Sequence, residues 1–178
     1  MRIIGIAAVA KNGVMGIDSK LPWDIPEDMS FFRKTTREQI VVLGRKSFDA
    51  IVEVTGKPLP KRENAVITRN DRWSFPGVRV FQGLEQAIRF YRESPDFSQK
   101  DLYIIGGAEI FAMAFPVLDE MLLTEIDTEI EGNIFFPDYR DGVFLRSEFS
   151  KAESRPQEQE QGTGYRYFFN RYVRRSNS

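Results

Sequence analysis

The sequence predicts a single α/β domain, with an eight-stranded, mainly parallel central sheet, antiparallel C-terminal strands and about four flanking helices. Three observations predict this fold. Short apolar runs without strict alternation, typical of strands covered on both faces, recur along the chain. Segments with helical spacing of apolar residues separate these runs over the first two thirds of the sequence. Beyond residue 119 the strand-like runs follow one another without helices, which predicts antiparallel pairing.

The chain length and composition suit one folded domain. A chain of 178 residues with 42% hydrophobic residues can build a sizeable core, and we expect one domain at 1–175 and a short polar tail at 176–178. Twenty-five basic and 26 acidic residues leave a net charge of −1, so we expect no nucleic-acid partner. No apolar run reaches the roughly 18 residues that span a bilayer. The sequence also shows no apolar edge strand of the kind that would indicate an oligomer. We therefore expect no membrane association and a monomer.

Two residue types are absent from the sequence. The chain has no Cys and no His, which excludes disulfides, Cys or His metal sites, and nucleophile systems that depend on His. Acid or base chemistry would therefore depend on carboxylates, Lys, Tyr or water. The lack of Cys is compatible with the cytoplasmic location that we expect. The apolar start of the chain resembles a signal peptide, but it has one basic residue and is short, so a strand is the better interpretation.

The elements follow in order along the chain. Strands are expected at residues 2–10, 39–44, 64–69, 78–81, 101–105, 121–126, 144–149 and 165–173. Helices are expected over residues 24–36, through 48–52, over 84–91 and from 108 to 115. Their alternation predicts right-handed crossovers between parallel strands. Residues 11–23 are too irregular for a helix and predict a long loop, and the polar residues 151–164 predict a hairpin connection.

The first predicted helix places an acid among apolar side chains. Asp24 has the position of an N-cap, and Glu27 follows it at capping-box spacing. The inward stripe is formed by Ile25, Met29 and Phe32, and Asp28 shares it by helical spacing. Two interpretations remain open here. Acids are favoured in a first helical turn, but a buried carboxylate also needs a partner, which could be a ligand.

Two strand-to-helix turns have residues suited to anions. One carries Gly44, Arg45, Lys46 and Ser47, although an ordinary helix start explains it too, and the upstream glycine of a Walker loop is missing. The other carries Gly106-Gly107, where either bound phosphates or a tight packing turn explains the glycines. An ordinary Rossmann dinucleotide site is not predicted, because G-x-G-x-x-G does not occur.

Several motifs together resemble the bacterial dihydrofolate reductases, from about residue 3 to residue 173. They are G-I-x-x-x-L-P-W-x-I-P-x-D at 16–28, V-L-G-R-K-S-F at 42–48, P-L-P-x-R at 58–62 and I-I-G-G-A-E-I-F at 104–111, followed by L-T-E-I-D and F-P-D-Y. The resemblance implies NADPH-dependent reduction of 7,8-dihydrofolate to tetrahydrofolate for one-carbon metabolism, with inhibition by antifolates. Hydride would pass from nicotinamide C4 to pterin C6, and water would protonate N5.

The resemblance also implies roles for individual residues. Asp28 would pair with the pterin N3 and 2-amino group, while Trp23 and Thr124 would hold the water and hydroxyl network around its carboxylate. Leu21 would lie over the nicotinamide, at the end of a closing loop at 12–21. Arg62 would clamp the glutamate α-carboxylate of the substrate. The remaining substrate-binding positions would be Ile6, Ala8, Met29, Phe32, Ile51, Leu59, Ile105 and Phe111.

The cofactor positions follow from the same resemblance. Thr68 and Arg69 would meet the adenosine 2′-phosphate, and the bond between Gly106 and Gly107 is usually cis in this family. The cofactor-binding positions would be Ala8, Met15, Gly16, Ile17, Lys20, Gly44, Arg45, Lys46, Ser47, Thr68, Arg69, Gly106, Gly107, Ala108, Glu109 and Ile110. No metal is implied.

This sequence departs from the family pattern at several positions. Phe111 replaces a common Tyr, Leu21 replaces a Met, and 52–55 is an insertion. Asn133 replaces an Asp that holds the closing loop, so we expect a weaker, uncharged contact there. Two alternative functions therefore remain: a pyrimidine reductase of the riboflavin pathway with the same fold, and an NADPH- or pterin-binding module without turnover.

Overall fold

The computed structural model of the chain describes residues 1–137, 149–157 and 164–175. Eight strands form one sheet in the order β5-β4-β3-β6-β1-β7-β10-β9, and in the described residues four α-helices accompany it. The predicted fold class is confirmed. The strands of this sheet are β1 (Ile3–Ala10), β3 (Ile40–Gly44), β4 (Glu63–Ile67), β5 (Arg79–Phe81), β6 (Leu102–Gly106), β7 (Glu120–Ile126), β9 (Phe149–Gln157) and β10 (Tyr167–Arg174). The helices are α1 (Pro26–Thr35), α2 (Arg45–Thr55), α3 (Leu84–Glu93) and α4 (Ala108–Ala114), with short 3-10 helices at Pro95–Phe97 and Phe115–Val117.

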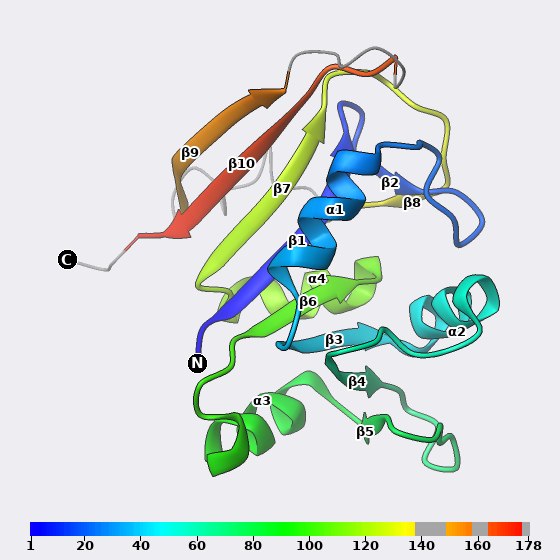
Figure 1. Cartoon of the computed structure of the whole chain (residues 1–178), viewed down its shortest axis with the longest axis vertical. Coiled ribbons are helices and arrows are strands. Elements are labelled where there is room, and N and C mark those ends of the chain that lie inside the picture. The colour runs from blue at the N-terminus through cyan, green and yellow to red at the C-terminus, as the bar shows by residue number, and fades with distance from the viewer. Residues whose placement is uncertain (138–148, 158–163, 176–178) are drawn as a thin grey trace.

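The helices cover both faces of the sheet. Alternate residues of β3 separate the two sides: Val41 and Leu43 pack with side chains of α1 and α2, whereas Ile40 and Val42 pack with α3 and α4. Figure 1 shows α1 lying across the front of the sheet, with α4 behind β1 and β6. This two-sided burial explains the apolar strands without alternation that the sequence shows.

The C-terminal strands differ in detail from the prediction. β7 pairs in parallel with β1, β10 pairs antiparallel with β7, and β9 pairs antiparallel with β10 at the sheet edge. The prediction of a hairpin connection over 151–164 was wrong for 151–157, because those residues belong to β9. An edge strand exposes much of its length, so it lacks the apolar pattern used to recognise strands. Residues 144–148 of the predicted strand and the tail at 176–178 lie outside the described residues.

The long loop after β1 is partly a strand. β2 (Val14–Gly16) pairs antiparallel with β8 (Ile134–Phe135) and forms a separate two-stranded sheet. Figure 1 shows this small sheet beside the N-terminal end of α1. The pairing was missed because each strand is too short for a recognisable pattern.

The predicted capping box of α1 is also wrong. Ile25 is the N-cap, with extended backbone and no capping side chain, and Pro26 opens the helix. Pro is favoured there because the first amide of a helix has no intrahelical partner. Glu27 instead accepts a hydrogen bond from the Tyr167 hydroxyl at 3.2 Å, which joins α1 to β10.

No helix in the described part of the chain is long and apolar enough to cross a membrane.

Candidate active site

Asp28 lies in the first turn of α1 and faces the sheet. Its side chain is 8% exposed, and the fully buried Thr124 of β7 donates a hydrogen bond from Oγ1 to its Oδ1 at 2.6 Å. Burial raises the pKa of the Asp28 carboxyl, because it disfavours the charged form, while the hydrogen bond from Thr124 acts in the opposite direction. A buried acid with one short hydrogen bond can exchange a proton or pair with a cationic ligand.

The residues beside Asp28 form an apolar pocket wall. Ile25 and Trp23 are buried, and the indole Nε1 of Trp23 is buried without a hydrogen-bond partner in the described residues. Phe31 and Phe32 are half-buried and pack with Leu59 against the strands under α1. A buried indole N–H usually has a partner, so this donor is suited to a ligand or a water.

The prediction that Met29 lies on the inward stripe of α1 was wrong. Met29 is 37% exposed, although the sequence placed it beside Asp28 on the buried face of α1. Ile25 precedes the helix, so helical spacing counted from it misplaces the stripe; counted from Asp28, Phe31 and Phe32 share its face. Among the other predicted pocket residues, Ile6 is buried, while Ala8, Ile51 and Ile105 are half-buried.

Arg62 lies beside the C-terminal end of α1 and is fixed by three hydrogen bonds. Its Nε donates to Thr36 Oγ1 at 2.8 Å, one terminal nitrogen donates to the Pro60 carbonyl at 2.6 Å, and the other donates to the Arg33 carbonyl at 2.9 Å. The guanidinium lies 5.8 Å from the centre of the Phe32 ring. Burial lowers the pKa of Arg62, and repulsion from Arg33 and Arg37 adds to the effect. This end of α1 is therefore electropositive and suited to an anion.

Three strand ends meet at a second part of the site. The register pairs Gly44 of β3 with Ile67 of β4, and Leu43 of β3 with Gly106 of β6. These pairings bring together three predicted cofactor segments at the carboxyl ends of adjacent strands. The segments are Thr68-Arg69, Gly44-Arg45-Lys46-Ser47 and Gly106-Gly107-Ala108-Glu109-Ile110.

The backbone at this edge has features of a phosphate site. Gly44 caps α2 with no capping side chain, so no side-chain acceptor from the cap satisfies the first amides of α2. The bond between Gly106 and Gly107 is cis, as expected. A Cβ on Gly107 would lie 3.0 Å from the Ser47 hydroxyl oxygen, so a larger residue there would require the Ser47 side chain to shift. Arg45, Lys46 and Ser47 supply two cations and a hydroxyl, a donor set that fits phosphate groups.

The loop that follows β1 borders the site and is fastened to residues 130–135. It carries four predicted cofactor residues: Met15 and Gly16 lie in β2, and Ile17 pairs with the exposed Lys20 across a turn. Asn133 accepts a hydrogen bond from the Asp18 amide at 3.1 Å and donates one to the Asp18 carboxylate at 2.8 Å. The predicted uncharged contact was wrong, because an amide donating to a carboxylate forms a charge-assisted hydrogen bond.

Two further predicted positions, Leu21 and Phe111, differ in their exposure to solvent. Leu21 is 48% exposed at the end of the loop, where a ligand could reach it. Phe111 is fully buried on the α3 and α4 side, with its ring 4.8 Å from that of Phe136. Phe111 therefore contributes to the core beneath Gly106. Its place among the substrate-binding positions stays a prediction. Residues 52–55, predicted to be an insertion, form the last turn of α2, and Gly56 follows it in the left-handed conformation.

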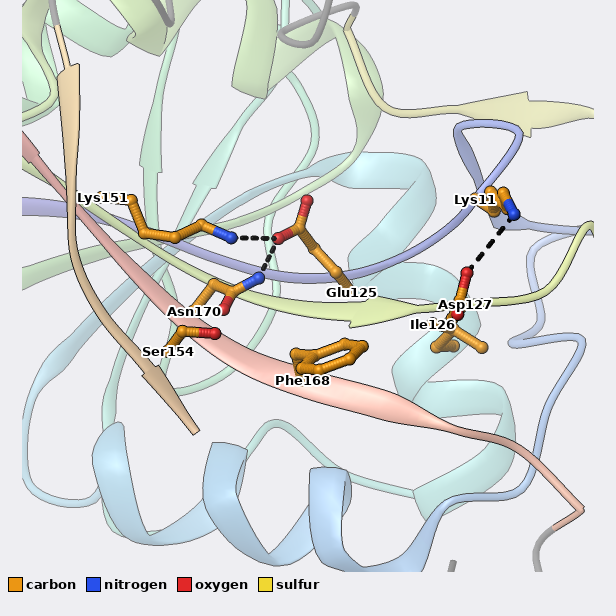
Figure 2. A pocket seen from close by; sticks show the side chains of 8 residues that line it. All are labelled: Lys11, Glu125, Ile126, Asp127, Lys151, Ser154, Phe168 and Asn170. Carbon is orange, nitrogen blue, oxygen red and sulfur yellow. Dashed lines mark hydrogen bonds and ion pairs between the residues drawn. The ribbon is translucent and has the colours of Figure 1, made fainter. Parts of the chain in front are cut away.

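A separate hollow lies on the other face of the sheet (Figure 2). Thr124 faces Asp28, so the next residue of β7, Glu125, faces the opposite side. There it accepts hydrogen bonds from Asn170 and, at 2.8 Å, from Tyr172, and Lys151 lies 3.6 Å away. These groups form contacts with one another, and we assign no ligand to the hollow. The described residues also contain no group of acids that could hold a metal ion.

Comparison with known proteins agrees with this geometry. A family model described as dihydrofolate reductase matches residues 2–174 of the chain. The chain belongs to the dihydrofolate reductase family. A type 3 dihydrofolate reductase of Salmonella typhimurium is 38% identical over 139 residues, covering 78% of this chain and 80% of the relative. A type A13 dihydrofolate reductase of Escherichia coli is 36% identical over 178 residues, covering 99% and 96%.

A solved structure extends the comparison to three dimensions. A dihydrofolate reductase from Enterococcus faecalis, complexed with NADP(H) and RAB-propyl, has a TM-score of 0.86 and 28% identity, covering 98% of this chain and 97% of that one. The fold of the dihydrofolate reductase family is therefore present over nearly the whole chain.

Sequence reasoning missed two residues that shape this dihydrofolate reductase site. Thr36 is fully buried and holds Arg62, but a Thr at a helix end has no distinctive pattern. Phe31 packs in the pocket wall beside Phe32, and correct placement of the start of α1 would have identified it. The contact of Thr36 with Arg62 joins segments distant from each other in sequence, whereas Phe31 follows from local helical spacing.

Proposed function

We propose that the chain catalyses NADPH-dependent reduction of 7,8-dihydrofolate to 5,6,7,8-tetrahydrofolate. The observation that carries this proposal is the buried Asp28 carboxyl, hydrogen-bonded to Thr124 and set in an apolar pocket. Membership of the dihydrofolate reductase family supports the reaction, and the NADP(H) complex of the Enterococcus faecalis relative supports the cofactor.

Asp28 binds and orients the pterin in this proposal. One carboxylate oxygen accepts from Thr124, and a carboxylate has capacity for further donors on both oxygens. The pterin N3 and 2-amino group supply two N–H donors on one edge, which makes a bidentate, charge-assisted contact. Ile6, Phe32, Leu59 and their neighbours enclose the rings, and Arg62 receives the glutamate carboxylate at the end of α1.

The turns at the strand ends hold the cofactor. Bound NADPH supplies the hydride that passes from nicotinamide C4 to pterin C6. Arg45, Lys46 and Ser47 bind its phosphates at the start of α2, and the backbone at Gly106 and Gly107 allows a close approach. Thr68 and Arg69, beside Gly44, favour NADPH over NADH by meeting the 2′-phosphate.

The proton for N5 is delivered by water in this proposal. The chain has no His, and Asp28 is committed to the other edge of the pterin. Asp28 favours the protonatable form of the pterin through its charge. The Trp23 N–H, which has no partner among the residues that the structure describes, is a donor for the ordered water. The loop at 12–21, fastened by Asn133, excludes bulk water from the nicotinamide.

The test is loss of reduced-nicotinamide absorbance when the purified protein is mixed with NADPH and dihydrofolate, with and without an antifolate. We expect rapid oxidation that the antifolate abolishes. NADPH binding without oxidation would support the binding module, and turnover only with a ribosylamino-pyrimidine would support the riboflavin-pathway reductase. A monomeric state and a cytoplasmic location remain predictions, which gel filtration and cell fractionation can check.

A further inference from the structure

Thr36 connects the C-terminal end of α1 to Arg62 through a single hydroxyl group. Its side chain is fully buried, and its Oγ1 donates to the Phe32 carbonyl at 2.8 Å. The same oxygen accepts from Arg62 Nε at 2.8 Å. Because a hydroxyl has one proton and a carbonyl can only accept, the proton must point to Phe32. The bond to Phe32 therefore turns a lone pair of Thr36 toward Arg62.

The other bonds of Arg62 leave two donors for a ligand. A guanidinium has five N–H groups, and Thr36, Pro60 and Arg33 accept three of them. The two remaining groups lie one on each terminal nitrogen, and a bidentate carboxylate contact uses two donors. Without the Thr36 hydroxyl, the half-buried Nε–H would lose its acceptor, and the guanidinium would rotate or draw in water.

We infer that Thr36 is a positioning residue, whose hydroxyl fixes the Arg62 guanidinium and thereby sets the affinity for the carboxylate tail of the substrate. This inference rests on the proposed role of Arg62 in the dihydrofolate reductase site. Thr36 acts through Arg62 and has no part in hydride or proton transfer. Loss of the Thr36 hydroxyl should therefore weaken the binding of ligands that carry a carboxylate and leave the binding of ligands without one unchanged.

The experiment compares Thr36→Val with Thr36→Ser, which keeps the hydroxyl. Each variant is assayed for kcat and KM with dihydrofolate. Dissociation constants are measured for an antifolate with a glutamate tail and for a 2,4-diaminopyrimidine inhibitor without a carboxylate. We expect Thr36→Val to raise KM and the first dissociation constant about tenfold, with kcat and the second constant changed less than twofold. Thr36→Ser should restore the wild-type values.

Thr55→Val is the matched control. Thr55 ends α2 as Thr36 follows α1. Its Oγ1 lies 2.7 Å from the carbonyl oxygen four residues earlier, that of Ile51, and shares its proton with the Lys57 carbonyl, also at 2.7 Å. It is exposed, so the same substitution removes the same kind of helix-end bond without affecting Arg62. We expect it to leave KM, kcat and both dissociation constants at wild-type values.

Arg62→Gln separates this inference from the proposed function. If Arg62→Gln weakens the binding of the ligands with a glutamate tail and Thr36→Val does not, the role of Thr36 is overturned while that of Arg62 stands. If Arg62→Gln has no effect, both roles fail. If Thr36→Val raises the dissociation constants of both inhibitors equally, α1 is generally disturbed, and this result would also overturn the inference. Thr36→Ala repeats the test if Thr36→Val does not fold, and the inhibitor constants remain decisive if the wild type lacks turnover.

Discussion

At Asp28, burial and hydrogen bonding act in opposite directions on the pKa of one carboxyl. Burial favours the neutral form and is the larger effect, while the hydrogen bond from Thr124 favours the charged form. The ligand-free protein therefore carries an acid that is less stable when ionised than it would be in water. Such a cost is common where a group is kept for binding or catalysis.

Asp28→Asn should lower turnover about 100-fold or more near neutral pH, because the amide cannot supply the negative charge. The ligand-free variant should be more stable than wild type at pH 7. Because the pKa of Asp28 is raised on folding, wild-type stability is lost as pH rises from the pKa in the unfolded chain through the pKa in the folded protein. Asn has no such ionisation, so the variant does not show this loss. Urea unfolding and the nicotinamide assay measure the two effects. Asp24→Asn, on an exposed neighbour, should change neither, and unchanged turnover in Asp28→Asn would refute the assigned role.

Thr124→Val should raise the pKa of Asp28 further, because it removes the hydrogen bond that favours the carboxylate. The carboxyl carbon of Asp28 can be titrated by NMR in the ligand-free protein. We expect its midpoint to move to higher pH in Thr124→Val and to stay near the wild-type value in Thr124→Ser. A midpoint that moves to lower pH would contradict the hydrogen-bond direction described above.

At the scale of elements, the site depends on how closely two irregular segments approach each other. The loop at 12–20 pairs with residues 130–135 through β2 and β8, the Asn133 contacts and a hydrogen bond from the Asn12 amide to the Ile130 carbonyl. A Cβ on Gly132 would overlap the Val14 side chain and lie 2.7 Å from the Gly16 carbonyl oxygen. Neither segment can move aside without losing this pairing.

Gly132→Ala should therefore separate the loop from β8 and lower kcat about tenfold or more, while the central sheet stays folded. Stopped-flow measurement of hydride transfer, beside circular dichroism, would show both effects. Gly83→Ala is the control, because a Cβ at Gly83 meets nothing within 4 Å. Equal kcat values for Gly132→Ala and wild type would show that the close approach is not needed for turnover.

At the scale of the whole molecule, an ion-pair network joins the two ends of the chain. The buried Glu120 of β7 accepts hydrogen bonds from Arg2 at 2.8 Å and from Arg171 of β10 at 2.8 and 2.9 Å. These contacts hold the pKa of Glu120 below its usual value. They connect the start of β1 to the antiparallel part of the sheet.

Glu120→Gln should reduce the free energy of unfolding by about 2 kcal/mol at pH 7, because two arginines lose a charged partner. Because the pKa of Glu120 is lowered on folding, its contribution to stability is present above the pKa of the unfolded chain and is lost as pH falls through the pKa of the folded protein. The difference in free energy of unfolding between wild type and Glu120→Gln should therefore become smaller in acid. Urea unfolding at several pH values checks this. A constant difference at every pH would contradict it. Glu153→Gln, which breaks an exposed pair with Arg155, should cost less than about 1 kcal/mol.

The sequence by itself determined the α/β class, most strands and helices, and the motifs that place the chain among the dihydrofolate reductases. These depend on apolar periodicity and turn residues, which are local properties of the chain. Tertiary structure alone decided that Met29 is exposed, that Phe111 belongs to the core, that polar residues 151–157 form an edge strand, and that Thr36 holds Arg62. Each of these depends on how distant segments pack, and local pattern carries no information about such contacts.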